Sequence, residues 1–357
     1  MIFSSVGNVY YIYYTTTVEK KQVFKKFFTT HSADFLQVTE RYIAIFAKTR
    51  QLYLVKEGLQ LNVISVFLAV CTATLAVQNT ASPTLAAVEP TITVQSGNSL
   101  INITVEEYTA GVLAHEMPYT FEAEALKAQA VAARTYLYYC LDNSSLYHQN
   151  ADVCTDITHC PGFITEDELA KRYGENCARA AMEASRYAAK ATAGEIVTYD
   201  GKPILAMWHS SSYSRTEDCE NVFIQSLPYL RSVESCEDAA GSTASFTLTE
   251  VNSILRGAGY RYNGSKNITL TNTPSGRCKS ISLGNITLSG TSVRKIFGLR
   301  STDFTAEIYR GRLYFTVRGY GHGVGLSQYG ANAMADGGAG YREILSHYYT
   351  GTDIGYR

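Results

Sequence analysis

The sequence predicts an α+β protein, with helices in the first half of a folded body and a mixed or antiparallel β-sheet from its second half. Stretches rich in Ala, Leu, Lys and Arg at 106–140 and 166–192 have a helical composition. From residue 195 onward, short segments of alternating apolar and polar residues predominate, and these are typical of strands. An uncharged apolar segment before the body predicts one N-terminal transmembrane helix.

Residues 1–57 carry more positive than negative charge, with eight Lys and Arg against four Asp and Glu. They mix aromatic residues with basic ones and show no core pattern. We predict a short cytoplasmic segment here, or a start codon placed too early in the reading frame. The whole chain has a net charge of −1, so no general attraction to nucleic acid is expected.

Residues 58–78 are predicted to form the transmembrane anchor. The stretch Leu59–Val77 is uncharged, and its 19 residues match the length of about 20 that a helix needs to cross a bilayer. Basic residues precede it and Glu89 is the next charge after it, so the N-terminus is expected in the cytoplasm and the body outside. The alternative is a signal peptide cleaved near Ala76 or Ala81.

Residues 79–95 are rich in Thr, Ala and Pro and are predicted to be an extended linker. The folded body then occupies residues 96–357, which is long enough for one large domain. Its first strand is expected at Ile101–Val105, and further strands between residues 195 and 319. Helices are expected at Glu106–Ala114, Ala123–Cys140, Glu166–Thr192, Leu248–Gly257, Gly290–Phe297, Ser327–Asp336 and Gly340–Tyr349.

The first candidate for chemistry is Glu116, in the segment HEMPYTF at 115–121. Pro118 breaks the helix and favours an extended Met117, so Glu116 is expected in a loop between two helical stretches. A carboxyl beside apolar Met and Pro is expected to be partly desolvated, which favours the protonated form that a general acid needs. From the residues alone, the alternative is a solvated side chain at a helix end.

A glycine-rich loop is expected between residues 319 and 330, where glycine occurs five times. Such a loop brings backbone N–H groups close to a ligand or to another part of the chain. His322 lies among the glycines and Gln328 follows them, so both are candidate groove residues. No Gly-Lys-Ser/Thr follows, so this is not a Walker loop. The alternative is a turn that serves only the fold.

A third segment, residues 208–223, begins WHSSSYSR and combines hydroxyl groups with aromatic rings. Ser211, Ser212 and Tyr213 are suited to hydrogen bonding and stacking against a sugar. A serine hydrolase would need a Gly-x-Ser-x-Gly elbow or a similar motif, and this segment has none. The alternative is a Ser-rich surface loop.

A fourth candidate combines two thiols with two imidazoles, which can complete a tetrahedral Zn²⁺ shell. Its residues are His148, Cys154, His159 and Cys160. The spacing is not that of a common zinc finger. An equally open interpretation is a Cys154–Cys160 disulfide in an exported protein.

Three long stretches, residues 105–139, 208–223 and 319–354, resemble the SpoIID/LytB family, and residues 296–304 are also similar to it. They follow one another in the order that the family shows. The resemblance implies that residues 96–357 form an extracytoplasmic catalytic domain of this family.

The resemblance implies a peptidoglycan lytic transglycosylase, which cleaves between N-acetylmuramic acid and N-acetylglucosamine without consuming water and leaves a 1,6-anhydro end. Glu116 matches the family's catalytic glutamate in its Glu-Met-Pro motif. It would protonate the leaving oxygen and then accept the proton of the muramoyl 6-hydroxyl. Arg134 matches a family position and is expected to orient substrate or Glu116. The implied groove residues are Ser211, Ser212, Tyr213, His322 and Gln328.

The resemblance also implies that the Cys/His set binds zinc, as in clostridial members, in a structural or groove-shaping role. His148, Cys154, His159 and Cys160 would be the ligands. The chain departs from the family at Tyr213-Ser214, where the family usually has two glycines. A bulkier loop at this point is expected to reshape the sugar subsites.

The sporulation members of the family imply a single-pass protein of the cell membrane that acts during engulfment, between forespore and mother cell. The expected partners are peptidoglycan strands, preferably stripped of stem peptides, a cell-wall amidase and a membrane scaffold. Two other functions compete with the lytic enzyme. One is a non-catalytic glycan-binding enhancer of an amidase, and the other is a zinc hydrolase, for which no HExxH motif is present.

Overall fold

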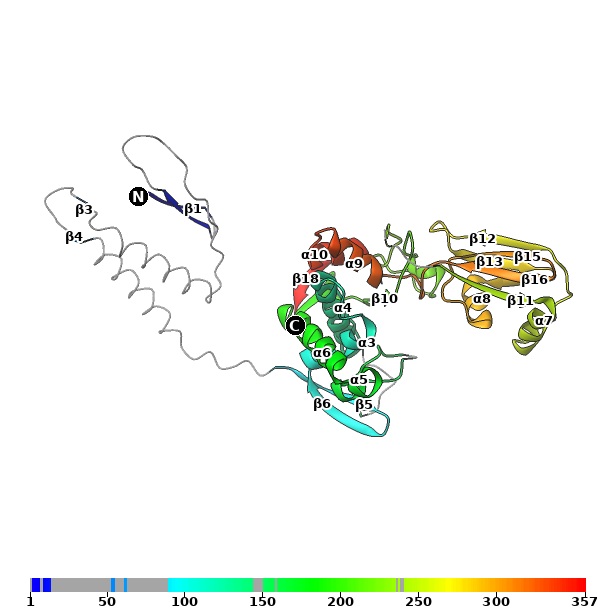
Figure 1. The fold of residues 1–357 in the computed structure, drawn as a ribbon, viewed down its shortest axis with the longest axis horizontal. Helices are drawn as coiled ribbons and strands as arrows, with labels where there is room; N and C mark the ends of the chain where they lie inside the picture. Colours follow the sequence, from blue (N-terminus) through cyan, green and yellow to red (C-terminus); the bar gives the residue numbers. More distant parts are fainter. Residues whose placement is uncertain are drawn as a thin grey trace. The chain divides into compact units, whose positions relative to one another are not determined.

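The computed structural model divides the chain into two compact units, Met1–Ala87 and Val88–Arg357 (Figure 1). It describes backbone strands at 2–6, 9–13, 53–54 and 61–62, and residues 89–143, 150–157, 159–235, 237 and 241–357. The strands of the first unit pair antiparallel, β1 (Ile2–Val6) with β2 (Val9–Tyr13) and β3 (Tyr53–Leu54) with β4 (Leu61–Asn62).

Most of the predicted transmembrane segment, residues 58–78, lies outside the described residues, so the anchor stays a prediction. Only the short strand β4 falls within that segment. Among the helices that the structure describes, none combines the length and the apolar composition that a membrane span requires.

The second unit begins with a hairpin, which corrects part of the predicted linker 79–95. Strand β5 (Thr91–Ser96) pairs antiparallel with β6 (Ser99–Thr104) and parallel with the short β7 (Val153–Cys154). Ile92 and Val94 are buried while Thr91 is exposed. This alternation is that of a strand with one face on a core, so the folded body starts before residue 96.

Four helices follow: α3 (Val105–Glu116), α4 (Ala123–Asp142), α5 (Glu166–Tyr173) and α6 (Glu175–Ala191). The prediction of one helix over 166–192 was wrong, because Gly174 separates α5 from α6. Its φ of 87° lies in a region that favours glycine, and the residue ends one helix and begins the next. Thr165 starts α5 with a capping box to Glu168.

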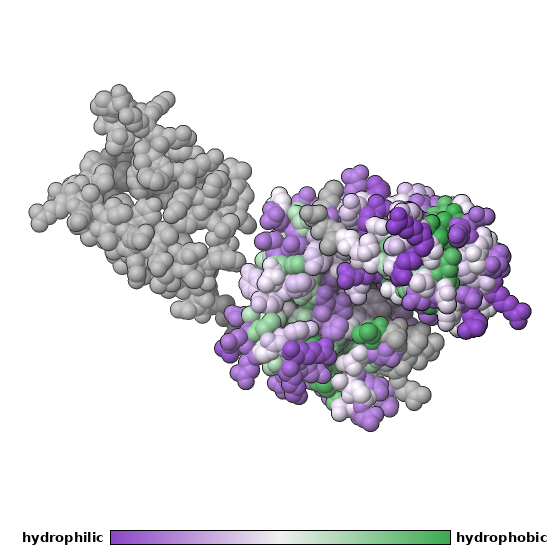
Figure 2. Space-filling model, turned by 45° about the vertical axis from the view of Figure 1, so that its right-hand side comes forward, coloured by the Kyte–Doolittle hydropathy of each residue, from purple (hydrophilic) through white to green (hydrophobic). Residues whose placement is uncertain are grey.

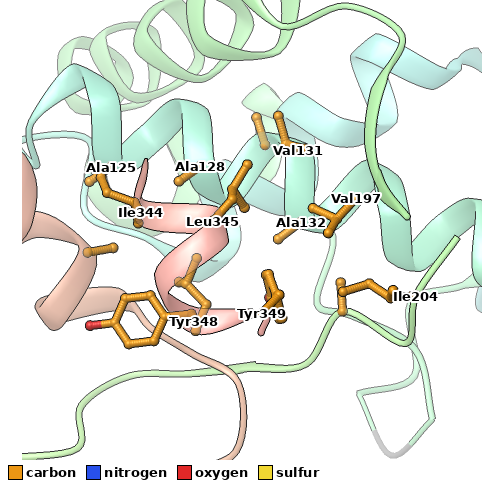
Figure 3. Close-up of a cluster of buried hydrophobic side chains, with 14 of the residues drawn as sticks. Ala125, Ala128, Val131, Ala132, Val197, Ile204, Ile344, Leu345, Tyr348 and Tyr349 are labelled. Atoms are coloured by element: carbon orange, nitrogen blue, oxygen red, sulfur yellow. The ribbon is translucent and has the colours of Figure 1, made fainter. Parts of the chain in front are cut away.

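Helix α4 is the centre of the largest core cluster. Its small residues Ala125, Ala128 and Ala132 allow close approach of α10 (Tyr341–Tyr348), whose Ile344 and Leu345 pack against them (Figure 3). The same cluster receives residues from β8 (Glu195–Tyr199), which pairs with β9 (Lys202–Pro203) and β18 (Asp353–Tyr356), and from α9 (Gln328–Asp336).

Residues 242–317 form a second, strand-rich group with its own core (Figure 1). One sheet has the order β11-β16-β15 and the other β12-β13-β14. The elements are β11 (Ser242–Thr247), α7 (Leu248–Gly257), β12 (Ile268–Asn272), β13 (Cys278–Leu283), β14 (Ile286–Ser289), α8 (Gly290–Phe297), β15 (Phe304–Tyr309) and β16 (Arg312–Val317). The predicted α+β class is confirmed, and the strands of residues 242–317 pair antiparallel.

In the chain, this strand-rich group lies between β10 (Trp208–His209) and β17 (Leu326–Ser327), which pair parallel with each other. The strand pair therefore brings the Ser-rich segment against the glycine-rich loop. On the face of the described residues in Figure 2, hydrophilic and intermediate residues prevail and hydrophobic ones form only small patches.

Candidate active site

Glu116 is the last residue of α3, where Pro118 prevents the helix from continuing. Met117 takes an extended conformation, with φ −128° and ψ 139°, and its side chain is buried in the main core. The helix end is therefore fixed by packing. The Glu116 side chain is 24% exposed, so it is accessible to solvent without being fully hydrated.

Two N–H donors from distant parts of the chain and the ring of the preceding residue, His115, surround the Glu116 carboxyl. Trp208 donates its indole N–H to Oε2 at 3.1 Å, and the backbone N–H of Gly162 donates to Oε1 at 3.2 Å. The Nδ1 atom of His115 lies 3.2 Å from the same Oε1. Fixed donors of this kind hold a carboxyl in one orientation and stabilise its ionised form after it has given up a proton.

Gly162 is required at its position by the close approach of His115. A Cβ at residue 162 would lie 2.1 Å from the His115 ring, far inside van der Waals contact. Glycine thus lets His115 pack against residue 162, whose backbone N–H donates to the Glu116 carboxyl. The sequence interpretation missed both Gly162 and the donor role of Trp208, although Trp208 stood out as the only tryptophan of the chain.

Trp208 is positioned by β10 and by an aromatic neighbour. Its backbone pairs with Leu326 of β17, and the Tyr136 ring meets the indole edge to face at a centroid distance of 5.8 Å. The Tyr136 hydroxyl donates to the backbone carbonyl of His159 at 3.4 Å. Trp208 therefore connects Glu116 with the Cys/His segment.

Exposed aromatic rings occur shortly after Glu116 in the chain and at the start of α9. Tyr119 is 37% exposed three residues after Glu116, and Tyr329 is 44% exposed at the start of α9. Phe121 packs edge to face on Tyr329 at 5.0 Å. Half-exposed rings of this kind can stack on the apolar face of a sugar ring.

The glycine-rich loop packs directly on the chain beneath it. A Cβ at Gly325 would lie 2.1 Å from the carbonyl oxygen of Met207, and one at Gly323 would lie 2.5 Å from the Arg277 guanidinium. Both glycines also have positive φ, at 73° and 85°. These glycines serve close packing, and through it they fix His322 next to Trp208.

His322 is neutral at physiological pH. Its Nδ1 accepts from the backbone N–H of Val324 at 3.0 Å, and its ring lies 5.6 Å from that of His209. Desolvation, followed by the charges of Arg294 and Arg277, lowers the pKa of His322 to about 4. The ring is also hydrogen-bonded to the backbone of Trp208, so His322 fixes the loop and cannot act as a cationic acid at neutral pH.

We expect His322 to make stability depend on pH. Its pKa in the folded state lies below the ordinary 6.5, so the unfolded chain binds the proton more readily and stability is lost as pH falls from about 6.5 to 4. Between pH 7 and 5 the wild type should lose about 1–2 kcal/mol more of its unfolding free energy than His322→Gln. Urea titrations at both pH values measure this difference, and equal losses would contradict it.

Ser211 and Ser212 are buried, at 7% and 0% exposed, which corrects their predicted contact with sugar. The backbone of Ser211 pairs with Tyr320, at 3.0 and 2.9 Å. His209 Nδ1 lies 3.2 Å from the Val324 carbonyl and must donate to it, so the Ser212 hydroxyl donates to His209 Nε2, at 2.5 Å. These serines fix the loop instead of lining a groove.

The carboxylate of Glu237 organises the same loop. It accepts from the backbone N–H groups of Ser212 and Tyr213 and from the hydroxyl groups of Ser235 and Ser327. A buried carboxylate needs this many donors. The sequence interpretation missed Glu237, because nothing in its local pattern marks it.

Tyr213 occupies a backbone conformation that favours glycine, with φ 79°. Its side chain is 40% exposed, and the Arg318 guanidinium lies 5.2 Å from the ring centroid. This position is where the sequence departs from the glycine usual in the resembled family. Among the predicted groove serines and tyrosine, Tyr213 alone presents its side chain at the surface.

We expect Tyr213→Gly to be more stable than Tyr213→Ala by about 1 kcal/mol, because both variants lose the ring but only glycine relieves the positive φ. Thermal unfolding of the two purified variants measures the difference. An equally stable pair would mean that the loop relaxes out of this conformation.

Arg134 does not line the site, which corrects the prediction that it orients substrate directly. Its side chain is fully buried. It forms an ion pair with Glu106, at the start of α3, and donates to the carbonyls of Ala189 at 2.9 Å and Glu195 at 3.0 Å. Arg134 therefore joins α3, α6 and β8, and it can affect Glu116 only through α3.

Gln328 is also mostly buried, at 5% exposed, and it begins α9. Its Nε2 lies 3.5 Å from Oε1 of Gln129 on α4, at the limit of a hydrogen bond. The side chain points to another helix, so its predicted place in the groove is not supported.

The Cys/His segment brings three of its four predicted ligands together. Ligand atoms of Cys154, His159 and Cys160 all lie within 4.8 Å of one another, while His148 lies outside the described residues. Cys154 and Cys160 are not joined by a disulfide in the structure, which does not form the alternative pairing. Burial raises the pKa of the Cys160 thiol to about 12. Two soft sulfurs and an imidazole are a donor set that fits zinc.

The fold and the site define an α+β protein with one candidate acid–base carboxyl, held by donors from two distant segments and backed by a Cys/His cluster. Only Pro161 separates Cys160 from Gly162, so the cluster and the backbone N–H that donates to Glu116 lie on one loop.

A sequence model of the SpoIID family, described as Stage II sporulation protein, matches residues 95–199. Stage II sporulation protein D of Bacillus amyloliquefaciens is 36% identical over 266 residues, which are 72% of this chain and 76% of that protein. Stage II sporulation protein D of Bacillus subtilis (strain 168) matches with the same identity and coverage. The amidase enhancer of Bacillus subtilis (strain 168) is 27% identical over 301 residues, 68% of this chain and 40% of that protein. The chain belongs to the SpoIID family of sporulation proteins.

Proposed function

We propose that this protein is a peptidoglycan lytic transglycosylase that cleaves between N-acetylmuramic acid and N-acetylglucosamine. The observation that carries the proposal is the placement of Glu116, whose carboxyl is held by Trp208 and Gly162 and is still 24% exposed. A general acid needs this combination of fixed orientation and access to the substrate.

In the proposed reaction, protonated Glu116 donates its proton to the glycosidic oxygen as the bond from that oxygen to the anomeric carbon breaks. The Glu116 carboxylate then accepts the proton of the muramoyl 6-hydroxyl as that oxygen bonds to the anomeric carbon. The carboxyl is thereby restored and no water is consumed. The N–H groups of Trp208 and Gly162 stabilise the carboxylate between the two transfers.

The proposed setting is the engulfment stage of sporulation, with the protein anchored in the cell membrane through residues 58–78 and residues 96–357 outside the cytoplasm. Membership of the SpoIID family supports the setting. Likeness to an amidase enhancer supports a cell-wall amidase as partner. A membrane scaffold is proposed as a second partner.

The test is an analysis of products from peptide-free glycan strands incubated with the full-length chain in heavy-oxygen water. The proposal expects 1,6-anhydro-muramoyl ends that contain no heavy oxygen, since the 6-hydroxyl and not water is the nucleophile. Reducing ends that contain heavy oxygen would show hydrolysis instead and would contradict the mechanism. Ordinary glycosidases use a second carboxylate for that reaction.

A second proposal is that Cys154, His159 and Cys160, with His148, bind one structural zinc ion. A bound zinc supplies a cationic centre that stabilises deprotonated sulfurs and closes the loop. The chain contributes the loop itself, in which the Asp156 N–H donates to the Cys154 sulfur at 3.2 Å. Gly162 of the same loop positions Glu116.

We expect Cys154→Ser to lower zinc content from about one ion per chain to near zero, because serine oxygen is a poor ligand for zinc. Elemental analysis of the purified chain measures this. Cys177→Ser, at a partly buried cysteine outside the cluster, is the matched control and should keep its zinc. Unchanged zinc in Cys154→Ser would rule out the site.

The alternative function is a non-catalytic glycan-binding enhancer of a cell-wall amidase, favoured by the likeness to a protein of that name. It expects strands to stay whole with the protein alone and amidase activity to rise when both are mixed. The product analysis above separates the two functions.

A further inference from the structure

An open cavity of about 550 Å³ lies where α8 meets the glycine-rich loop. Helix α8 and the segment after it supply three cationic side chains, Arg294, Lys295 and Arg300, and the loop supplies Tyr320. Tyr320 is 54% exposed, and the Arg300 guanidinium lies 5.8 Å from its ring centroid. None of these side chains has a part in the acid–base site.

Within the described part of the chain, none of these three cations forms an ion pair with a carboxylate. By contrast, Arg318, directly before the glycine-rich loop, pairs with Asp303 at 2.7 Å. Arg294 is half-buried, and desolvation lowers its pKa. A partly dehydrated cation without an anion is costly, and a bound anion would offset that cost.

The cavity is connected with the acid–base site through the glycine-rich loop. The backbone N–H of Gly321 donates to the Arg300 carbonyl at 3.0 Å. The next residue, His322, is hydrogen-bonded to the backbone of Trp208. Trp208 in turn donates to Glu116. The glycine-rich loop therefore links the wall of the cavity with the residues that hold Glu116.

We propose that this cavity binds the lactyl carboxylate of a muramoyl residue in peptide-free glycan. The inference rests on the proposed function and names the feature by which the site selects its substrate. In a strand that carries stem peptides, this carboxyl is part of an amide and bears no charge. Once the peptide is removed, it is a carboxylate that Arg294, Lys295 and Arg300 can bind.

The test measures binding with the full-length chain, purified in detergent and carrying Glu116→Gln so that no strand is cleaved. The two probes are peptide-free strands and the same strands after their lactyl carboxylates have been coupled to methylamine. We expect the acid strands to bind about tenfold more tightly, and Arg294→Gln combined with Arg300→Gln to abolish that preference. Lys279→Gln, the same charge change at an exposed residue of β13 outside the cavity, should keep it.

If the Glu116→Gln chain bound both probes equally tightly, the inference would be overturned. It would also be overturned if the double arginine variant kept the preference for acid strands while its melting temperature equalled that of the Glu116→Gln chain. Polyglycerol phosphate is a third probe, with phosphate in place of carboxylate. If the double variant bound this probe less tightly but kept its preference for acid strands, the cavity would be a phosphate site and the inference would fail. A chain that prefers acid strands but never cleaves them would uphold the cavity and refute the lytic activity. A chain that cleaves strands but binds both probes equally would uphold the lytic activity and refute the role of the cavity.

Discussion

Glu116→Gln is expected to lower the rate of glycan cleavage about a thousandfold or more, because the amide cannot donate the proton that the leaving oxygen needs. The variant keeps the size of the side chain and an oxygen that can accept from Trp208 or Gly162. Its melting temperature should therefore stay close to that of the wild type. The measurement is the rate of anhydro-end formation by mass spectrometry, with circular dichroism to verify folding.

The matched control is Trp208→Phe, which keeps an aromatic ring against Tyr136 but removes the indole N–H that holds Oε2. This variant should lower the rate of glycan cleavage roughly tenfold, since one donor to the carboxyl is lost while the carboxyl itself remains. If Glu116→Gln cleaved strands as fast as the wild type, another group would be the acid and the proposed mechanism would be wrong.

Arg134→Met is expected to destabilise the protein by about 3 kcal/mol, because it removes the cation that pairs with a partly buried carboxylate and the N–H groups that donate to two buried carbonyls. The carboxylate is that of Glu106, whose side chain is only 21% exposed, and the carbonyls are those of Ala189 and Glu195. A loss of this size lowers the melting temperature by roughly 6–12 °C in a domain of this length.

The control for this prediction is Arg186→Met, since Arg186 also contacts α3 but does so at the surface. It pairs with Glu107 and Glu166, and its side chain is 46% exposed. Exposed pairs of this kind contribute less than about 1 kcal/mol. If Arg134→Met cost no more than Arg186→Met, the structural role of Arg134 would be wrong. If the folded variant instead lost affinity for glycan, the arginine would act on substrate after all.

The features that could be predicted from sequence are those that local chemistry decides. Pro118 ends α3 directly after Glu116, and the proline ring excludes a helix whatever packs around it. Cys154, His159 and Cys160 meet because only seven residues of chain contain them all. The α+β class followed in the same way from composition and from the change of hydrophobic period along the chain.

Local patterns also misled where a single residue or a buried partner decided the outcome. Gly174 divides a stretch of uniform helical composition, because its positive φ ends one helix. Ser212 belongs to a hydrophilic segment, but its hydroxyl is satisfied by His209, and so it can be buried. Arg134 can be buried for the same reason, since it forms an ion pair with Glu106 and donates hydrogen bonds to two backbone carbonyls.

The sequence by itself determined the class of fold, the break at Pro118 and the nearness of the thiols in the Cys/His segment; it placed Glu116 in a loop, whereas α3 extends to include it. Only the tertiary structure decided what holds the Glu116 carboxyl. Its donors lie 92 residues away, at Trp208, and 46 residues away, at Gly162. Propensity and periodicity act over a few residues, whereas these contacts arise from the pairing of β10 with β17 and from the close packing of residue 162 on His115.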